Sequence, residues 1–240
     1  MLRIWILRIQ RISTIVIVWL LFLGVLYSFY YVLFERSIFK VKNVEVVGEL
    51  IHVTAADVIA LADIKEGTNL FSVSLGSVKE KVLSNPWVKE IAVARKLPGT
   101  VWIYVNEYVP FAILSNEGFF YMNYEGVVFK KMERMDDKNF PVLTGVSDGK
   151  NLQEALGLLK TYLEMPIAEF FPPAEISLSR ARGFIIMLDR DNIALRLGFE
   201  NLEEKIERFY SILKAIGMRG RKIRYVDLNI PGKVVIKYES

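Results

Sequence analysis

The hydrophobic pattern begins with an uncharged run near the N-terminus. Residues 12–34 read ISTIVIVWLLFLGVLYSFYYVLF and contain no charged side chain. As a helix rising ~1.5 Å per residue, this run is about 34 Å long, enough to cross a hydrocarbon core ~30 Å thick. It is longer than the apolar region of a cleaved signal peptide, and its end is bulky. We therefore expect an uncleaved transmembrane helix over residues 12–34, preceded by a tail at 1–11.

The next segment alternates between strand-like and helix-like patterns. Thr54 is a suitable N-cap for the first expected helix, and Pro86 stops the second. Pro98-Gly99 is a turn signal between the last two strands. The expected elements are strands at 39–48, 87–95 and 100–107 and helices at 54–63 and 75–84. This order predicts a three-stranded sheet with two helices on one face.

The second half of the chain is mostly short strands separated by Asn, Glu and Gly turns. Two stretches instead place apolar residues at helical spacing, 152–163 and 201–216. The expected strands are 111–114, 119–123, 126–129, 175–178, 183–188, 192–197, 223–230 and 233–238. The fold class is therefore α+β, with an N-terminal transmembrane helix, a small β-α-α-β-β domain and a mainly antiparallel β domain with two helices.

The positive charge of the chain is concentrated before the apolar run. The chain has 31 basic and 27 acidic residues, and Arg3, Arg8 and Arg11 precede any acidic residue. The bias of basic residues toward the cytoplasm places the N-terminus there and the following domains outside. Because the rest of the chain is nearly neutral, no nucleic-acid partner is expected, and the strand aromatics Trp87 and Trp102 are interpreted as packing residues, as is Tyr104.

Composition excludes several kinds of chemistry. There is no cysteine and one histidine, so disulfides, thiol nucleophiles and cysteine-ligated metals are impossible. His52 has no second histidine with which to share a metal, and we interpret it as a loop residue. No catalytic residue, cofactor, metal or small-molecule substrate is expected.

Two fragments resemble catalytic or phosphate-binding motifs without completing them. Residues 145–151 have three residues between two glycines and Asn151 after the lysine, whereas a phosphate-binding loop needs four and a Ser or Thr. Ser211 and Lys214 match the S-x-x-K of penicillin-binding transpeptidases, but no K-T-G occurs. We interpret the first fragment as a turn and the second as solvated helix surface.

The predicted domains have exposed sheet edges. A small sheet has edge strands that are unpaired on one side, and the last predicted strand, 233–238, lies close to the C-terminus. Exposed edges are templates for strand addition by another chain.

Several segments resemble the FtsQ/DivIB family of bacterial cell-division proteins. They are VKNVEVVG, EGTNLF and LSNPWVKEIAVARKLPGTVWIYVNE in the first half, and NYEGVVF, FPVLTG and YVDLN in the second. The resemblance implies a POTRA (polypeptide-transport-associated) domain over 38–108 and a β domain over 109–240. Asn229 stands where the family usually has arginine, and Ile230-Pro231 also departs from its pattern.

The resemblance implies a non-enzymatic scaffold at the division septum, in the cell (inner) membrane. Its implied partners are FtsB-like and FtsL-like single-span proteins, and it would help regulate septal peptidoglycan synthesis by FtsW and its transpeptidase. The resemblance also implies that a partner strand adds beside the last strand. The expected partner-binding residues are Val226, Leu228, Ile230, Lys233, Val234, Val235, Ile236 and Tyr238.

Two alternative functions stay open. A membrane-tethered cell-wall enzyme would use Ser211. A POTRA module of a secretion or assembly machine would bind unfolded strands, although such proteins usually continue into a β-barrel.

Overall fold

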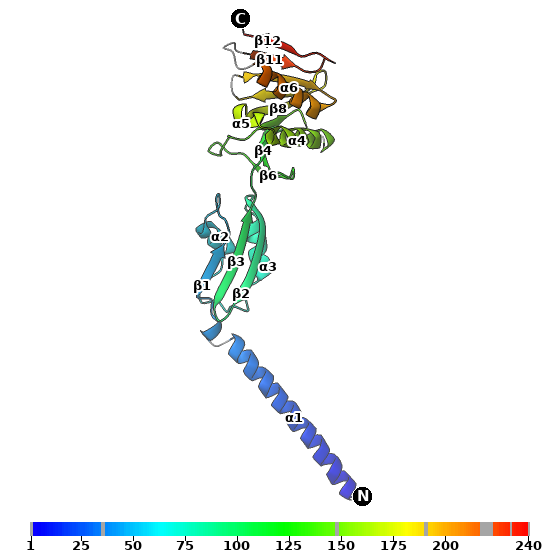
Figure 1. The fold of residues 1–240 in the computed structure, drawn as a ribbon. Coiled ribbons are helices and arrows are strands. Elements are labelled where there is room, and N and C mark those ends of the chain that lie inside the picture. The colour runs from blue at the N-terminus through cyan, green and yellow to red at the C-terminus, as the bar shows by residue number, and fades with distance from the viewer. Residues whose placement is uncertain are drawn as a thin grey trace. The chain divides into compact units, whose positions relative to one another are not determined.

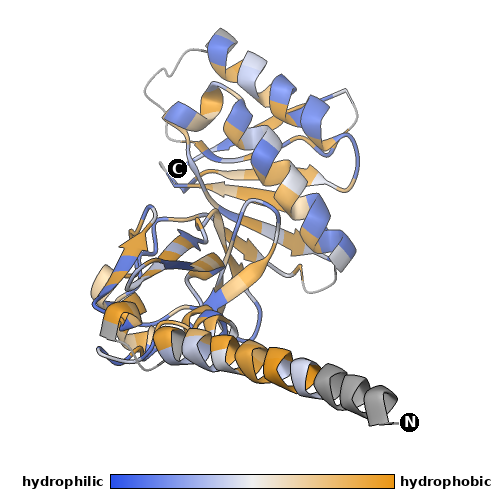
Figure 2. Cartoon of the chain, turned by 90° about the horizontal axis from the view of Figure 1, so that it is seen from below, coloured by the Kyte–Doolittle hydropathy of each residue, from blue (hydrophilic) through white to orange (hydrophobic). Residues whose placement is uncertain are grey.

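The computed structural model describes residues 2–34, 37–146, 149–189, 192–216, 223–230 and 232–239. It has two compact units, Met1–Glu107 and Tyr108–Ser240. The first unit opens with helix α1, Leu2–Phe34, whose stretch Ser13–Val32 is long and apolar enough to cross a bilayer (Figure 2). The helix predicted over 12–34 is confirmed, but it begins earlier, because no glycine or proline interrupts residues 2–12.

The rest of the first unit is a three-stranded sheet with two helices (Figure 1). Its elements are a 3-10 turn η1 (Ser37–Phe39), β1 (Asn43–Val47), α2 (Ala55–Ala62), α3 (Leu75–Leu83), β2 (Val88–Lys96) and β3 (Thr100–Glu107). The strand order is β1-β3-β2, with β1 parallel and β2 antiparallel to β3. The predicted β-α-α-β-β order is confirmed.

Period-two burial on β3 explains why both helices lie on one face. Val101, Ile103 and Val105 are fully buried, and they share one core with Val58 of α2 and Val78 of α3. The intervening residues of β3 point to the other face. The first strand is shorter than predicted, because the amides of Val41 and Lys42 bond to loop carbonyls of Thr68 and Gly99 instead of to a strand.

The second unit is built on one nine-stranded sheet, ordered β12-β11-β10-β9-β8-β7-β4-β5-β6. Its strands are β4 (Ala112–Ser115), β5 (Phe119–Met122), β6 (Val128–Lys131), β7 (Val142–Thr144), β8 (Pro173–Ser179), β9 (Gly183–Leu188), β10 (Ala194–Gly198), β11 (Ile223–Asp227) and β12 (Val235–Tyr238). Five neighbouring pairs are antiparallel and three are parallel, so the mainly antiparallel sheet is confirmed.

Helices α4 (Gly149–Glu164), α5 (Ile167–Phe170) and α6 (Leu202–Ile216) belong to this unit. The sequence predicted two of them and missed α5, which is only four residues long. It also missed β7, because three residues are too few to show a period. The strand predicted at 126–129 begins later, because Asn123 to Val127 form a turn in which Gly126 has a φ of +86°.

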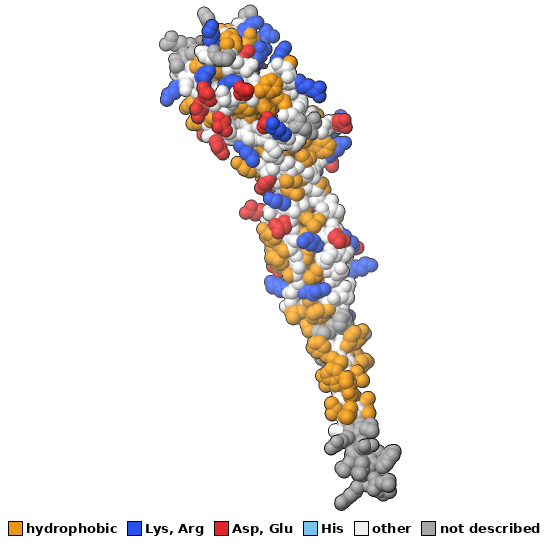
Figure 3. Space-filling model, turned by 90° about the vertical axis from the view of Figure 1, so that its right-hand side faces the viewer, with side chains coloured by type: hydrophobic (Ala, Val, Ile, Leu, Met, Phe, Trp, Pro, Cys, Tyr) orange, Lys and Arg blue, Asp and Glu red, His pale blue; other side chains and the backbone are white. Residues whose placement is uncertain are grey.

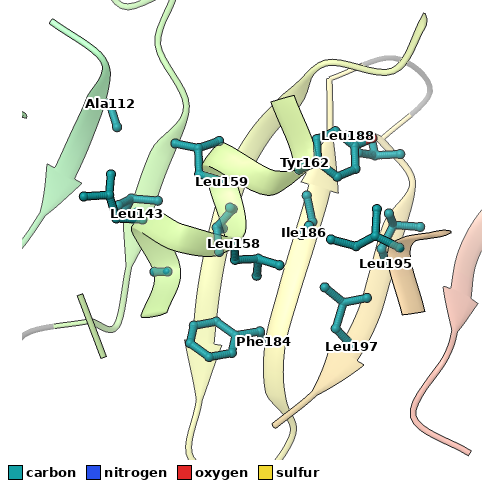
Figure 4. Packing of buried hydrophobic residues seen from close by; sticks show 14 of the residues in the cluster. Ala112, Leu143, Leu158, Leu159, Tyr162, Phe184, Ile186, Leu188, Leu195 and Leu197 are labelled. Carbon is teal, nitrogen blue, oxygen red and sulfur yellow. The ribbon is translucent and has the colours of Figure 1, made fainter. Parts of the chain in front are cut away.

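A row of apolar residues in register crosses the sheet and forms its core face. The row is Ile236, Val226, Leu195, Ile186, Ile176, Leu143 and Leu114, one residue on each of seven neighbouring strands. Helix α4 packs on β8 and α6 on β10, and Figure 4 shows Leu159 and Tyr162 of α4 beside the strands of this row. This continuous core anchors the sheet as far as β12, its terminal strand.

Candidate partner-binding edge

The last strand lies at one edge of the nine-stranded sheet. In the described part of the chain, β12 has β11 as its only strand neighbour (Figure 1). The two strands are antiparallel, with Asp227 opposite Val235 and Val226 opposite Ile236. The other side of β12 therefore presents backbone N–H and C=O groups that another chain can pair.

The predicted binding residues fall into two groups. Val226 and Leu228 are 0% and 1% exposed and belong to the core, so their side chains position β11 and are not available to a partner. Ile230 and Val235 are 42% and 41% exposed. Alternation in YVDL, with apolar residues two apart, was the sequence signal for this burial.

The closing strand also starts later than predicted. Lys233 and Val234 precede β12, because the amide of Lys233 bonds to the carbonyl of Ile230 in a turn that contains Gly232 at a φ of +69°. Pro231 lies outside the described residues. Within β12, Ile236 packs on the core while Val235 and Lys237 are exposed, and Tyr238 is half-buried.

A polar cluster lies on the face of β10 and β11 opposite the core. The Arg196 guanidinium lies 4.1 Å from the ring centre of Tyr225, and its Nη1 is 3.9 Å from Asp227 Oδ2. The Lys237 Nζ is 6.0 Å from the same tyrosine ring. Two basic side chains, Arg196 and Lys237, therefore lie near the Tyr225 ring beside the edge strand.

A cavity of about 370 Å³ opens at the start of this edge, between the first turns of α6 and the residues before β12. Phe199 is 57% exposed and lines it together with Arg208 and Ile230. Asn229, which stands where the resemblance implies arginine, also lines the cavity, and its backbone amide donates to Asp227 Oδ1 at 3.0 Å. Sequence reasoning missed this cavity, because its residues come from segments about thirty positions apart.

The other candidate residues are placed as follows. Ser211 and Lys214 are exposed on α6, and the Ser211 hydroxyl donates to the carbonyl of Glu207. Of the phosphate-loop-like segment, residues 147–148 lie outside the described part, and α4 begins at Gly149. His52 lies in a loop as predicted, and among the described residues no group of three His, Cys, Asp or Glu side chains could hold a metal ion.

Comparison with known proteins identifies both units. Residues 39–108 match the FtsQ-type POTRA domain, and residues 112–229 match the C-terminal domain of the cell division protein FtsQ/DivIB. The cell division protein FtsQ of Geotalea daltonii is 28% identical over 222 residues, which cover 88% of this chain and 80% of that protein. FtsQ of Actinobacillus pleuropneumoniae is 31% identical over 161 residues, 66% and 68% of the two chains. DivIB of Geobacillus kaustophilus is 26% identical over 200 residues, 81% and 75% of the two chains. The chain therefore belongs to the FtsQ/DivIB family of cell division proteins.

Proposed function

We propose that this protein is a non-enzymatic scaffold of the division machinery that captures a partner by strand addition at β12. The observation that carries the proposal is the position of β12 at the edge of the sheet, with Val235 exposed. Strand addition draws its affinity from main-chain hydrogen bonds and its specificity from alternate side chains.

The opposite edge of the same sheet is the natural competitor. Its strand β6 carries two successive lysines, Lys130 and Lys131, and Lys130 is buried in an ion pair with Asp136. Lysines and inward-pointing charges on edge strands oppose pairing with other chains. The four residues of β12 read VIKY and include a single lysine. The contrast favours β12 as the capturing edge.

The proposed partners are FtsB-like and FtsL-like single-span division proteins, and through them FtsW and the septal transpeptidase. In this arrangement 1–11 is a cytoplasmic tail and 12–34 is the membrane anchor. The POTRA domain at 38–108 and the β domain at 109–240 lie outside the membrane. Arg3, Arg8 and Arg11, which precede the apolar stretch of α1, support this orientation. By holding these partners together, the protein would help to regulate septal peptidoglycan synthesis.

The test is a proline substitution at the proposed edge. In Val235→Pro the backbone loses one donor, and we expect about a tenfold weaker complex with the extracytoplasmic segment of the FtsB-like partner. Val128 on β6 is also a valine and is 41% exposed, as Val235 is, so Val128→Pro is the matched control. Val235→Ala, which keeps the N–H, should retain binding.

Binding is measured by titration of the full chain in detergent, with thermal unfolding of each variant alongside. Equal affinity for Val235→Pro and the unaltered protein would overturn the proposal. A larger loss in Val128→Pro would move the capturing edge to β6.

A further inference from the structure

The POTRA domain has a pronounced separation of charge between the two ends of its sheet. At one end, segments 38–45, 64–72 and 95–100 hold five basic and two acidic residues; we name them the basic end. At the other end, segments 47–57, 86–90 and 105–107 hold four acidic and one basic residue; we name them the acidic end. β3 runs from Thr100 to Glu107, so it separates the two ends by about 23 Å.

The three segments of the basic end form one fixed surface. The amide of Lys42 bonds to the Gly99 carbonyl at 2.8 Å, and the amide of Val41 bonds to the Thr68 carbonyl at 2.8 Å. Arg95 holds the loop from the side, since its guanidinium donates to the carbonyl of Val73 at 2.7 Å. The backbone segments that carry the charges of this end are therefore held together.

This surface combines exposed lysines with exposed apolar side chains. Lys40, Lys42 and Lys65 are all exposed, and basic side chains are visible at this end of the domain in Figure 3. Leu97 at the β2–β3 turn is 61% exposed, and Ile38 is 47% exposed. Lysines beside apolar side chains are typical of surfaces that lie at a lipid–water boundary.

The covalent connection keeps the basic end near the membrane anchor. Helix α1 ends at Phe34, and Phe39 is already part of the domain, where its ring contacts that of Phe71 at 5.3 Å. Five residues span at most about 18 Å when fully extended. If α1 crosses a bilayer, the acidic end can be much farther from the headgroups than the basic end.

We infer that the basic end of the POTRA domain lies on the anionic lipid surface from which the anchor emerges. Lysine side chains pair with lipid phosphates, and Leu97 and Ile38 enter the headgroup region. The contact orients the domain so that its acidic end, and with it the start of the β domain at Tyr108, points away from the membrane. The inference rests on the proposed membrane anchoring of α1, but not on strand capture at β12.

The test uses single cysteines, because the chain has none of its own. The full chain is reconstituted in vesicles of phosphatidylcholine alone or mixed with phosphatidylglycerol. A fluorophore is attached at Leu97→Cys, with Ile51→Cys as the matched control, an apolar residue 78% exposed at the acidic end. Headgroup-labelled lipid quenchers then report contact with the surface.

We expect strong quenching at position 97 only in the anionic vesicles, and little at position 51 in either. Each of the changes Lys40→Gln, Lys42→Gln and Lys65→Gln should lower the ratio of surface-bound to free orientations about fivefold. High salt should act in the same direction because it screens the charges. Lys89→Gln at the acidic end should leave the quenching at position 97 unchanged.

Equal quenching at position 97 in both kinds of vesicle, or unchanged quenching in a variant that combines Lys40→Gln, Lys42→Gln and Lys65→Gln, would overturn the inference. A third label at Val25→Cys, in the apolar stretch of α1, distinguishes a POTRA domain that does not contact the lipid surface from an α1 that does not insert. Acyl-chain quenchers should reach Val25 in every vesicle. If they do not, α1 is not inserted, and both the anchor and this inference are overturned.

Discussion

At the scale of single residues, Glu107 shows how one buried charge organises a loop. Its side chain is 5% exposed, and its carboxylate accepts the backbone amides of Ile51, His52 and Val53 at 3.0 to 3.2 Å. The His52 Nδ1 lies 3.0 Å from the same carboxylate, and its ring stacks on Trp87 at 3.6 Å. A buried carboxylate is tolerated because donors surround it.

Removing this carboxylate should release the loop. We expect Glu107→Ala to destabilise the POTRA domain by about 2 to 3 kcal/mol, since several amides lose a charged acceptor. Hydrogen exchange of the amides of residues 51–53 should accelerate in the same variant. Glu90→Ala, at an exposed position on β2, is the control, and an equal effect there would contradict this account.

The sequence could place His52 in a loop, but not next to Glu107. The two residues are 55 positions apart, and nothing in local spacing marks them as a pair. The same holds for Gly198 and Asn229, which approach across the strand end. Pairs of this kind follow from strand order, which periodicity does not determine.

At the scale of elements, the N-terminal cap of α2 was predictable from the sequence. Thr54 caps α2 in a reciprocal arrangement: its hydroxyl accepts the amide of Asp57, and the Asp57 carboxylate accepts the amide of Thr54. Hydrogen bonds from the side chain and backbone of Thr54 lower the pKa of Asp57 below its ordinary value of 3.8. A polar residue before an apolar repeat was sufficient to predict this cap.

The cap should contribute in a pH-dependent way. Thr54→Ala is expected to cost about 1 kcal/mol near neutral pH. Because the pKa of Asp57 is lower in the folded state, its part of the stabilisation is present above 3.8 and is lost as the pH falls through the lowered value. Urea unfolding at neutral and acidic pH should show the difference shrinking in acid, whereas Thr54→Ser should behave like the unaltered protein. A difference that grows in acid would contradict the assignment.

The same substitution should have opposite effects at two glycines. Gly183 has a φ of +72°, and an added Cβ would lie 2.2 Å from the backbone of Gly198, so Gly183→Ala should destabilise the β domain by about 1 to 3 kcal/mol. Gly157 is exposed on α4 with open space around it, so Gly157→Ala should stabilise by about 0.5 to 1 kcal/mol. Thermal unfolding of both variants checks the signs, and a stabilising Gly183→Ala would contradict the close approach of β9 and β10.

At the scale of the whole molecule, strand order decides which strands lie at the edges of the sheet. The sequence predicted the strands of both units, with β7 missed, but period-two patterns do not say which strand pairs with which. The nine-stranded order brings β12 to one edge and β6 to the other. All seven residues of the core row are apolar, so a shift of one residue in any of their strands would turn that strand's row residue away from the core. This fixes the register as far as β12.

The most direct test of strand capture compares these two edges by crosslinking. Single cysteines at Val235 and Val128, which are equally exposed, are coupled to a photoreactive group in the full chain within membranes of dividing cells. We predict that Val235→Cys crosslinks to a single-span division protein of the FtsB type and that Val128→Cys does not. Crosslinking to that protein from position 128 alone, or equally from both positions, would contradict capture at β12.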